Sequence, residues 1–219
     1  MNACFLCSSL GSRDIAETWN QPLLESQNFV VIPSLGALVE GWLLLVPKDH
    51  YLCLGALPNE LIPEFQMMKH NVSELLHQKY GSVVIFEHGP ARPSAGVGCS
   101  VDHAHLHLVP LEFDLARASI GFLPQCATWN SATFLECQQA FEQGQDYLYL
   151  EQTWGSGLIA THEHFGSQLF RRAIAAHIGY PDQFAWRENP QFPIVEQTIK
   201  AIQAFRGSVQ SSTGVVSGP

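Results

Sequence analysis

Three histidines, His103, His105 and His107, alternate with apolar residues in the middle of the chain. Side chains two positions apart point to the same side of an extended strand. The pattern therefore places the three imidazoles on one face and the intervening apolar side chains on the other. A neutral imidazole can ligate a metal ion, and it is also a nucleophile that departs readily from phosphorus. The sequence thus predicts a chemical site on the solvent-facing side of a strand.

The segment before this strand holds several glycines and prolines between Gly89 and Gly98, which are typical of a loop. A Gly-containing loop that leads into a histidine-rich strand is where we expect the chemistry. Glu87 borders the loop, and two interpretations stay open for it: contact with a substrate, or a capping or turn role.

Cys4 and Cys7 form a Cys-x-x-Cys pair near the N-terminus. Two thiolates at this spacing can share one zinc ion, and a tetrahedral site needs two more nitrogen or sulfur ligands. His50 and His103 are the candidates for these positions. Such a site would be structural, since four protein ligands leave no open position for water. The alternative is that both cysteines are free thiols near a frayed terminus.

The hydrophobic pattern predicts the elements that must position these residues. Apolar runs at 29–32 and 42–46, each followed by a proline, indicate two neighbouring strands of a largely antiparallel sheet. Apolar residues spaced by three and four indicate an amphipathic helix between about 59 and 80. Further strands are expected at 83–86 and 103–111.

Beyond Phe113 the sequence predicts a helix at 131–143, a strand at 147–150 and a helix at 168–178. The last helix carries Arg171 and Arg172, for which a solvated face is favoured over contact with a substrate phosphate. We divide the chain into a domain of residues 1–115, a C-terminal α/β extension packed on it at 116–206, and a flexible tail at 207–219.

Composition narrows the classes of partner. The 219 residues are 46% hydrophobic and 14% charged, an ordinary globular balance, and the net charge is −9 without a clustered basic face. We therefore expect no long nucleic acid as partner, whereas a small nucleotide can be held by backbone N–H groups and neutral histidines. The chain shows no apolar run of membrane-spanning length and no secretory signal, so we expect a cytoplasmic protein without a membrane partner.

Taken together, three motifs resemble the histidine-triad (HIT) superfamily. They are the His103-x-His105-x-His107 run followed by Leu108-Val109-Pro110, the segment Gly41 to Tyr51, and Cys4-Phe5-Leu6-Cys7. The resemblance covers roughly residues 4–112 and implies an α+β fold, a meander of five antiparallel strands with a packed helix, and a homodimer. A looser likeness to Cwf19-like proteins covers the segment from Leu169 to Arg187.

The resemblance also implies roles for individual residues. His105 matches the family's nucleophile, which attacks the α-phosphorus of a nucleotide and holds the nucleotidyl group as a phosphoramidate. His107 matches the residue that contacts the phosphate and the leaving group. Ser100 and the loop from Gly96 to Gly98 match the donors to the phosphate oxygens, which stabilise charge in the transition state. In zinc-carrying branches such as the galactose phosphate uridylyltransferases, the ligands match Cys4, Cys7, His50 and His103.

Three positions depart from the family pattern. Trp42 stands where the family usually has a fourth histidine, Cys99 where it has a glutamine, and Ser34 where it has an acidic residue that binds ribose. All three are expected at the substrate site. Two functions follow as hypotheses: a nucleotide hydrolase or nucleotidyl transferase, and a catalytically weak nucleotide-binding or interaction module on a zinc-stabilised fold.

Overall fold

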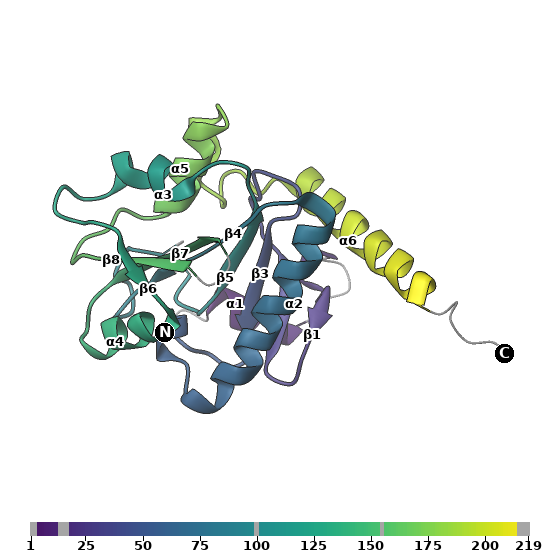
Figure 1. Cartoon of the computed structure of the whole chain (residues 1–219), viewed down its shortest axis with the longest axis horizontal. Helices are drawn as coiled ribbons and strands as arrows, with labels where there is room; N and C mark the ends of the chain where they lie inside the picture. The colour runs from purple at the N-terminus through teal and green to yellow at the C-terminus, as the bar shows by residue number, and fades with distance from the viewer. Residues whose placement is uncertain (1–3, 13–17, 99–100, 154–155, 214–219) are drawn as a thin grey trace.

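The computed structural model describes residues 4–12, 18–98, 101–153 and 156–213. Its strands form one antiparallel sheet in the order β1-β2-β3-β5-β4-β7-β8-β6 (Figure 1). Their bounds are Leu24–Glu25 for β1, Phe29–Pro33 for β2, Leu43–Pro47 for β3, Val83–Gly89 for β4, Leu106–Pro110 for β5, Asn130–Ala132 for β6, Tyr147–Thr153 for β7 and Ser156–Thr161 for β8.

Helices cover both faces of this sheet. The α-helices are α1 (Phe5–Ser12), α2 (Ile62–Tyr80), α3 (Leu115–Ser119), α4 (Phe134–Glu142), α5 (Leu169–His177) and α6 (Phe192–Thr213). Short 3-10 turns are η1 (Thr18–Asn20), η2 (Leu54–Ala56), η3 (Asn59–Leu61), η4 (Ile120–Phe122) and η5 (Pro181–Gln183). The arrangement confirms the predicted α+β class with an antiparallel sheet and packed helices. Among the described helices, none is long and apolar enough to cross a bilayer.

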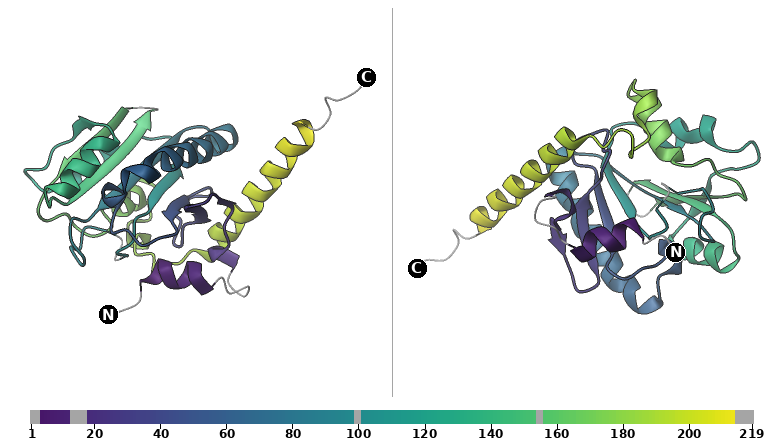
Figure 2. Two further views of the ribbon diagram at one scale, coloured as in Figure 1. Left: turned by 90° about the horizontal axis from the view of Figure 1, so that it is seen from below. Right: turned by 180° about the vertical axis from the view of Figure 1, so that it is seen from behind.

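The two faces of the sheet follow from strand alternation. Leu44 of β3 lies opposite His107 of β5, and His107 lies opposite Phe86 of β4, so these three side chains share one face, which we call the site face. Leu6 of α1 packs on the site face beside Leu44, and α5 packs on it farther along the sheet. The helices α1 and α2 lie on opposite sides of the strands (Figure 2).

Helix α2 covers the other face, which we call the back face. Its buried side chains Phe65, Met68, Val72 and Leu76 are spaced by three and four residues, as predicted, and they pack in one cluster with leucines of β3 and β5. The helix ends at Tyr80, and the next residue, Gly81, caps it with a positive φ of 89° that favours glycine.

The predicted strands and helices are present, with shifted ends. The strand expected at 103–111 begins only at Leu106, because the pairing of β3 with β5 stops at Leu45 opposite Leu106. Before that point, the N–H of Ala104 donates to the carbonyl of Tyr51, 2.7 Å away, in the loop after β3. His103 and His105 therefore precede the strand.

The sheet extends beyond the five strands implied by the resemblance. Strand β7 pairs with β4 through five residue pairs, from Ile85 opposite Glu151 to Gly89 opposite Tyr147. The sheet thus runs without interruption from the first 115 residues into the C-terminal segment. Helix α6 continues through Thr213, so residues 207–213 of the expected flexible tail are helical.

Candidate functional site

The three alternating histidines are all buried. Their exposed fractions are 1% for His103, 7% for His105 and 2% for His107. The sequence predicts that the histidines face solvent, and this prediction is wrong. Helices α1 and α5 cover the part of the site face on which His107 lies. His103 also lies in a cluster with Cys4, Cys7 and His50, apart from the other two histidines.

His105 presents a neutral imidazole with a defined tautomer. Its Nδ1 lies 2.6 Å from the carbonyl oxygen of His103, which can only accept, so Nδ1 carries the proton. Burial lowers the pKa of His105 below its usual value, and this keeps the ring neutral. The lone pair therefore lies on Nε2, the nitrogen that would attack an electrophile.

His107 has the opposite tautomer. The indole Nε1–H of Trp42 donates to Nδ1 of His107 over 2.9 Å, so the proton of the neutral ring lies on Nε2. The ring stacks on Phe86 with centroids 4.5 Å apart, and burial holds the pKa of His107 well below its usual range. Nε2 of His107 is buried and has no hydrogen-bond partner in the described part of the chain. His107 thus offers an unused N–H donor beside the ring of His105, whose centroid is 4.9 Å away.

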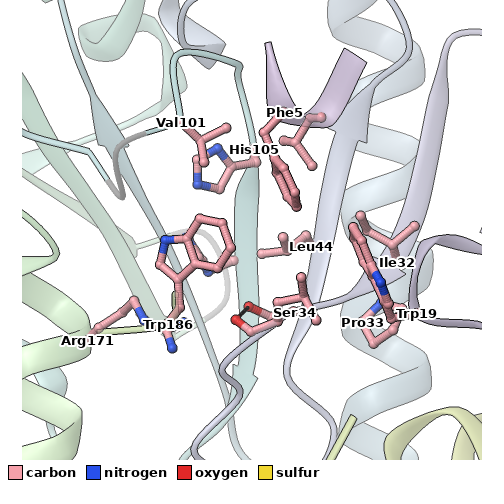
Figure 3. Close-up of a pocket in the computed structure, with 13 residues that line it drawn as sticks. Phe5, Trp19, Ile32, Pro33, Ser34, Leu44, Val101, His105, Arg171 and Trp186 are labelled. Atoms are coloured by element: carbon pink, nitrogen blue, oxygen red, sulfur yellow. Dashed lines mark hydrogen bonds between the residues drawn. The ribbon is translucent and has the colours of Figure 1, made fainter. Parts of the chain in front are cut away.

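A cavity over β2, β3 and β5 joins these groups, and we call it the His105 cavity (Figure 3). Its walls come from distant parts of the chain: Phe5 and Leu6 from α1, Trp19 from η1, Ile32 to Leu35 from β2 and the turn after it, Leu44 from β3, Val101, His105 and His107 from the histidine segment, and Arg171 and Trp186 from the C-terminal segment. Ser34, one of the residues predicted to bind substrate, lines this cavity.

Trp42 does not reach the cavity. Its side chain is fully buried behind His107, where it donates to the imidazole and stacks edge-on against Phe86. The prediction that Trp42 lies at the substrate site is corrected accordingly: its side chain contacts His107 and does not line the cavity.

Glu87 is also turned away from the cavity. Because Phe86 shares the site face with His107, the next residue along β4 points to the back face. There the carboxylate of Glu87 accepts from the backbone N–H of Leu54 at 2.6 Å and from the hydroxyl of Tyr147 at 2.5 Å. The structure therefore favours the structural interpretation of Glu87 over substrate contact.

The loop before the histidines is anchored to the C-terminal segment. The carbonyl of Gly98 accepts from the hydroxyl of Ser167 at 2.9 Å, and Gly96 has a left-handed φ of 76°. Neither glycine lines the His105 cavity as the structure describes it. Cys99 and Ser100, the other predicted phosphate-binding residues of this loop, lie outside the described residues.

Four predicted metal ligands come together at the N-terminal end of α1. The Sγ atoms of Cys4 and Cys7 and one ring nitrogen each of His50 and His103 all lie within 4.8 Å of one another. Nδ1 of His103 is 3.4 Å from Cys4 Sγ and 3.3 Å from Cys7 Sγ, and Nδ1 of His50 is 3.4 Å from Cys7 Sγ. Tetrahedral zinc with bonds of ~2.3 Å to sulfur and ~2.0 Å to nitrogen would separate such atoms by roughly 3.5 Å.

The second nitrogen of His103 supports the same interpretation. Nε2 donates to the carbonyl of Pro47 over 2.9 Å, which leaves Nδ1 with a lone pair directed at the two sulfurs. An outer hydrogen bond of this kind is the usual way in which a protein orients a metal-binding histidine. The cluster could therefore hold a metal ion.

The sequence does not predict several of the residues that line the cavity. Phe5 stacks on Trp19 with centroids 5.6 Å apart and meets Trp186 at 5.4 Å, so residues far apart in the chain form one aromatic wall. Arg171, for which a solvated face was favoured, is only 1% exposed and lines the cavity. No local pattern marks these residues; Phe5 alone has a signal, its place between the two cysteines.

Comparison with protein-family models and with curated proteins finds no match to this chain. Among solved structures, a hypothetical histidine triad nucleotide-binding protein from Sulfolobus tokodaii is 19% identical, with a TM-score of 0.40, covering 64% of this chain and 91% of that one. A Hit-like protein from Bartonella henselae is 14% identical, with a TM-score of 0.41, covering 66% and 98%. Yeast Ap4A phosphorylase in complex with AMP is 15% identical, with a TM-score of 0.39, covering 63% and 56%. At these values the function must be argued from the chain's own site.

Proposed function

We propose that this chain is a nucleotide hydrolase or nucleotidyl transferase of the histidine-triad type, with His105 as its nucleophile. The observation that carries the proposal is the hydrogen bond from Nδ1 of His105 to the carbonyl of His103. It fixes the tautomer whose Nε2 lone pair is available, in a cavity where burial keeps the ring neutral.

The reaction proceeds in two displacements at the α-phosphorus of a nucleotide phosphoanhydride or phosphoramidate. Nε2 of His105 forms an N–P bond while the bond from phosphorus to the leaving group breaks with its electron pair. Nε2–H of His107 is placed to donate to a phosphoryl oxygen or to the departing atom. Water or another acceptor then attacks phosphorus, the N–P bond breaks, and neutral His105 is restored as the acceptor loses its proton.

A structural zinc ion on Cys4, Cys7, His50 and His103 belongs to the same proposal. The sulfur-to-nitrogen separations and the orientation of His103 fit a closed tetrahedral site. When bound, zinc would tie α1 to the loop after β3 and to His103. Because the carbonyl of His103 orients His105, these four ligands would affect catalysis only through the position of His105.

The test is turnover of a panel of adenosine and guanosine phosphoramidates and dinucleoside polyphosphates by wild type and His105→Asn. Loss of a nucleophile costs several orders of magnitude, so we expect a fall of about 10³-fold or more with the fold retained. His70→Asn, an exposed histidine on the back-face helix α2, is the control and should keep wild-type turnover.

His105→Asn that keeps more than about a tenth of wild-type turnover would contradict covalent catalysis by this residue. If the wild type binds nucleotides but turns over none of the panel, the protein is instead a nucleotide-binding module.

A further inference from the structure

A second cavity, which we call the Asp146 cavity, lies where β4 ends and β7 begins. Strand pairing brings its parts together: Gly89 at the end of β4 lies opposite Tyr147, and Tyr147 lies opposite Thr161 at the end of β8. The turn after α4 completes the wall with residues 143–145. The cavity has a volume of about 670 Å³, which is the size of a small-molecule site. It shares no described lining residue with the His105 cavity.

Asp146 forms the floor of this cavity. Its exposed fraction is 3%, whereas the other described residues of the lining are exposed or half-buried. Oδ1 accepts from the backbone N–H of Ala91 over 2.8 Å, and Oδ2 is buried without a hydrogen-bond partner in the described residues. Nor does a basic side chain of the described residues form an ion pair with this carboxylate. A buried carboxylate is costly without such a partner, so Oδ2 is an acceptor for a ligand.

The surroundings of Asp146 favour a cation. Glu163 adds a second carboxylate to the lining, and the turn at Gly144 follows the C-terminal end of α4, where the helix dipole is negative. The last turn of α4 holds no basic side chain that would offset this dipole. Arg92 also lines the cavity, but it is exposed and forms no ion pair with either carboxylate within the described chain.

The side chains of the cavity do not suit a metal ion. Nδ1 of His162 accepts from the backbone N–H of His164 over 3.0 Å, so the ring is neutral and Nε2 carries the proton. Among the described residues, the ligand atoms that come close enough to share a metal ion belong to the cluster of Cys4, Cys7, His50 and His103, not to this cavity. An organic cation with N–H groups instead offers Oδ2 both a charge and a hydrogen bond.

We propose that the Asp146 cavity binds a small organic cation through a primary ammonium or guanidinium group that donates to Oδ2 of Asp146. Such a group supplies the hydrogen bond and the positive charge that this carboxylate does not receive from the described residues. The inference does not depend on the reaction proposed for His105, because the two cavities have separate linings.

Three probes separate the need for charge from the need for N–H donors. Methylguanidinium has both, methylurea has N–H groups without the charge, and tetramethylammonium has the charge without N–H groups. In ¹⁵N-labelled wild type, the backbone N–H of Ala91 reports binding because it donates to Asp146. We expect methylguanidinium to shift this resonance with a dissociation constant at least about tenfold lower than that of either other probe.

Asp146→Asn removes the charge and keeps an Oδ1 acceptor for Ala91, so it should weaken binding of methylguanidinium by about tenfold or more. Asp182→Asn, at an exposed aspartate outside both cavities, is the matched control and should keep wild-type affinity. If Asp146→Asn fails to fold, the comparison of the three probes in wild type decides. Equal affinity for the three probes, an Ala91 resonance shifted by magnesium chloride but not by methylguanidinium, no shift with any probe, or wild-type affinity in folded Asp146→Asn would overturn the proposal.

Discussion

Trp42 and His107 show how one atom can define the chemistry of a site. The indole N–H is a donor only, so Nδ1 of His107 must accept and Nε2 must hold the proton. The sequence leads us to expect Trp42 as a substrate contact and as a sign of weakened activity. In the structure Trp42 instead donates to Nδ1 of His107, so that the Nε2–H of His107 lies beside His105, and we propose that Trp42 positions this donor.

Trp42→Phe should therefore lower turnover while the fold persists, because the ring remains and the N–H is lost. We expect a decrease of about 5- to 30-fold, corresponding to a hydrogen bond of about 1–2 kcal/mol. The side-chain ¹⁵N spectrum should show the His107 tautomer becoming mixed. Trp129→Phe removes an indole N–H that has no partner in the described residues. This control should change neither the turnover nor the tautomer of His107. A pure Nε2–H tautomer in Trp42→Phe would contradict this role.

Residue patterns predict the cluster of Cys4, Cys7, His50 and His103 well, because ligand type and spacing are visible in the sequence. They do not predict that Arg171 is buried, where it donates to the carbonyls of Phe184 and Gly36. The local sequence shows the chemical type of each residue and its spacing from its neighbours. It does not show which distant segments of the chain will surround that residue in the fold.

At the scale of elements, the alternation of β4 separates two tasks. Phe86 packs on His107 on the site face, whereas Glu87 ties β4 to the η2 turn on the back face. The sequence predicts the strand itself. Which face of the sheet each side chain takes depends on how β4 pairs with β5, and this pairing cannot be deduced from the sequence. That is why substrate contact and a structural role could not be distinguished for Glu87.

Burial raises the pKa of Glu87 from 4.5 to about 7. Between these values the folded protein binds more protons than the unfolded chain, so this group's contribution to the free energy of unfolding falls as pH rises through the window. Glu87→Gln should therefore gain up to about 3 kcal/mol relative to wild type between pH 5 and pH 8. Urea unfolding of both proteins across this range measures the difference. A difference that does not vary with pH would contradict an ionisable Glu87 with this environment.

Helix α1 couples the proposed metal site to the cavity. Cys4 and Cys7 face the metal cluster, whereas Phe5 and Leu6 between them line the His105 cavity. Residues 4–7 thus supply two members of the cysteine–histidine cluster and part of the cavity wall. Loss of the metal should loosen this wall as well as the terminus.

Elemental analysis should accordingly give close to one zinc per chain, and chelation should lower the thermal midpoint, since metal binding is coupled to folding. Cys7→Ser should lose zinc and stability together. Cys126→Ser, at an exposed cysteine outside the cluster, should retain both. Metal-free protein with unchanged melting would remove zinc from the account.

At the scale of the whole molecule, one sheet runs through both parts into which the sequence analysis divides the chain. The strands expected at 29–32, 42–46 and 83–86 form close to those bounds, whereas the strand expected at 103–111 begins only at Leu106. The addition of β7, β8 and β6 to the same sheet depends on long-range pairing, such as Glu87 opposite Tyr149, for which no local pattern exists. The cavity therefore takes its walls from both halves of the chain, as in Arg171 and Trp186 beside His105.

The central claim is that His105 carries the nucleotidyl group during turnover. The direct measurement is a base quench of wild type during turnover, which preserves a phosphoramidate, followed by mass spectrometry of the peptides. We predict a nucleoside monophosphate adduct on the peptide that contains His105, lost on brief acid treatment and absent from His105→Asn. Turnover with an adduct on another residue, or with none at any quench time while substrate is consumed, would contradict the account.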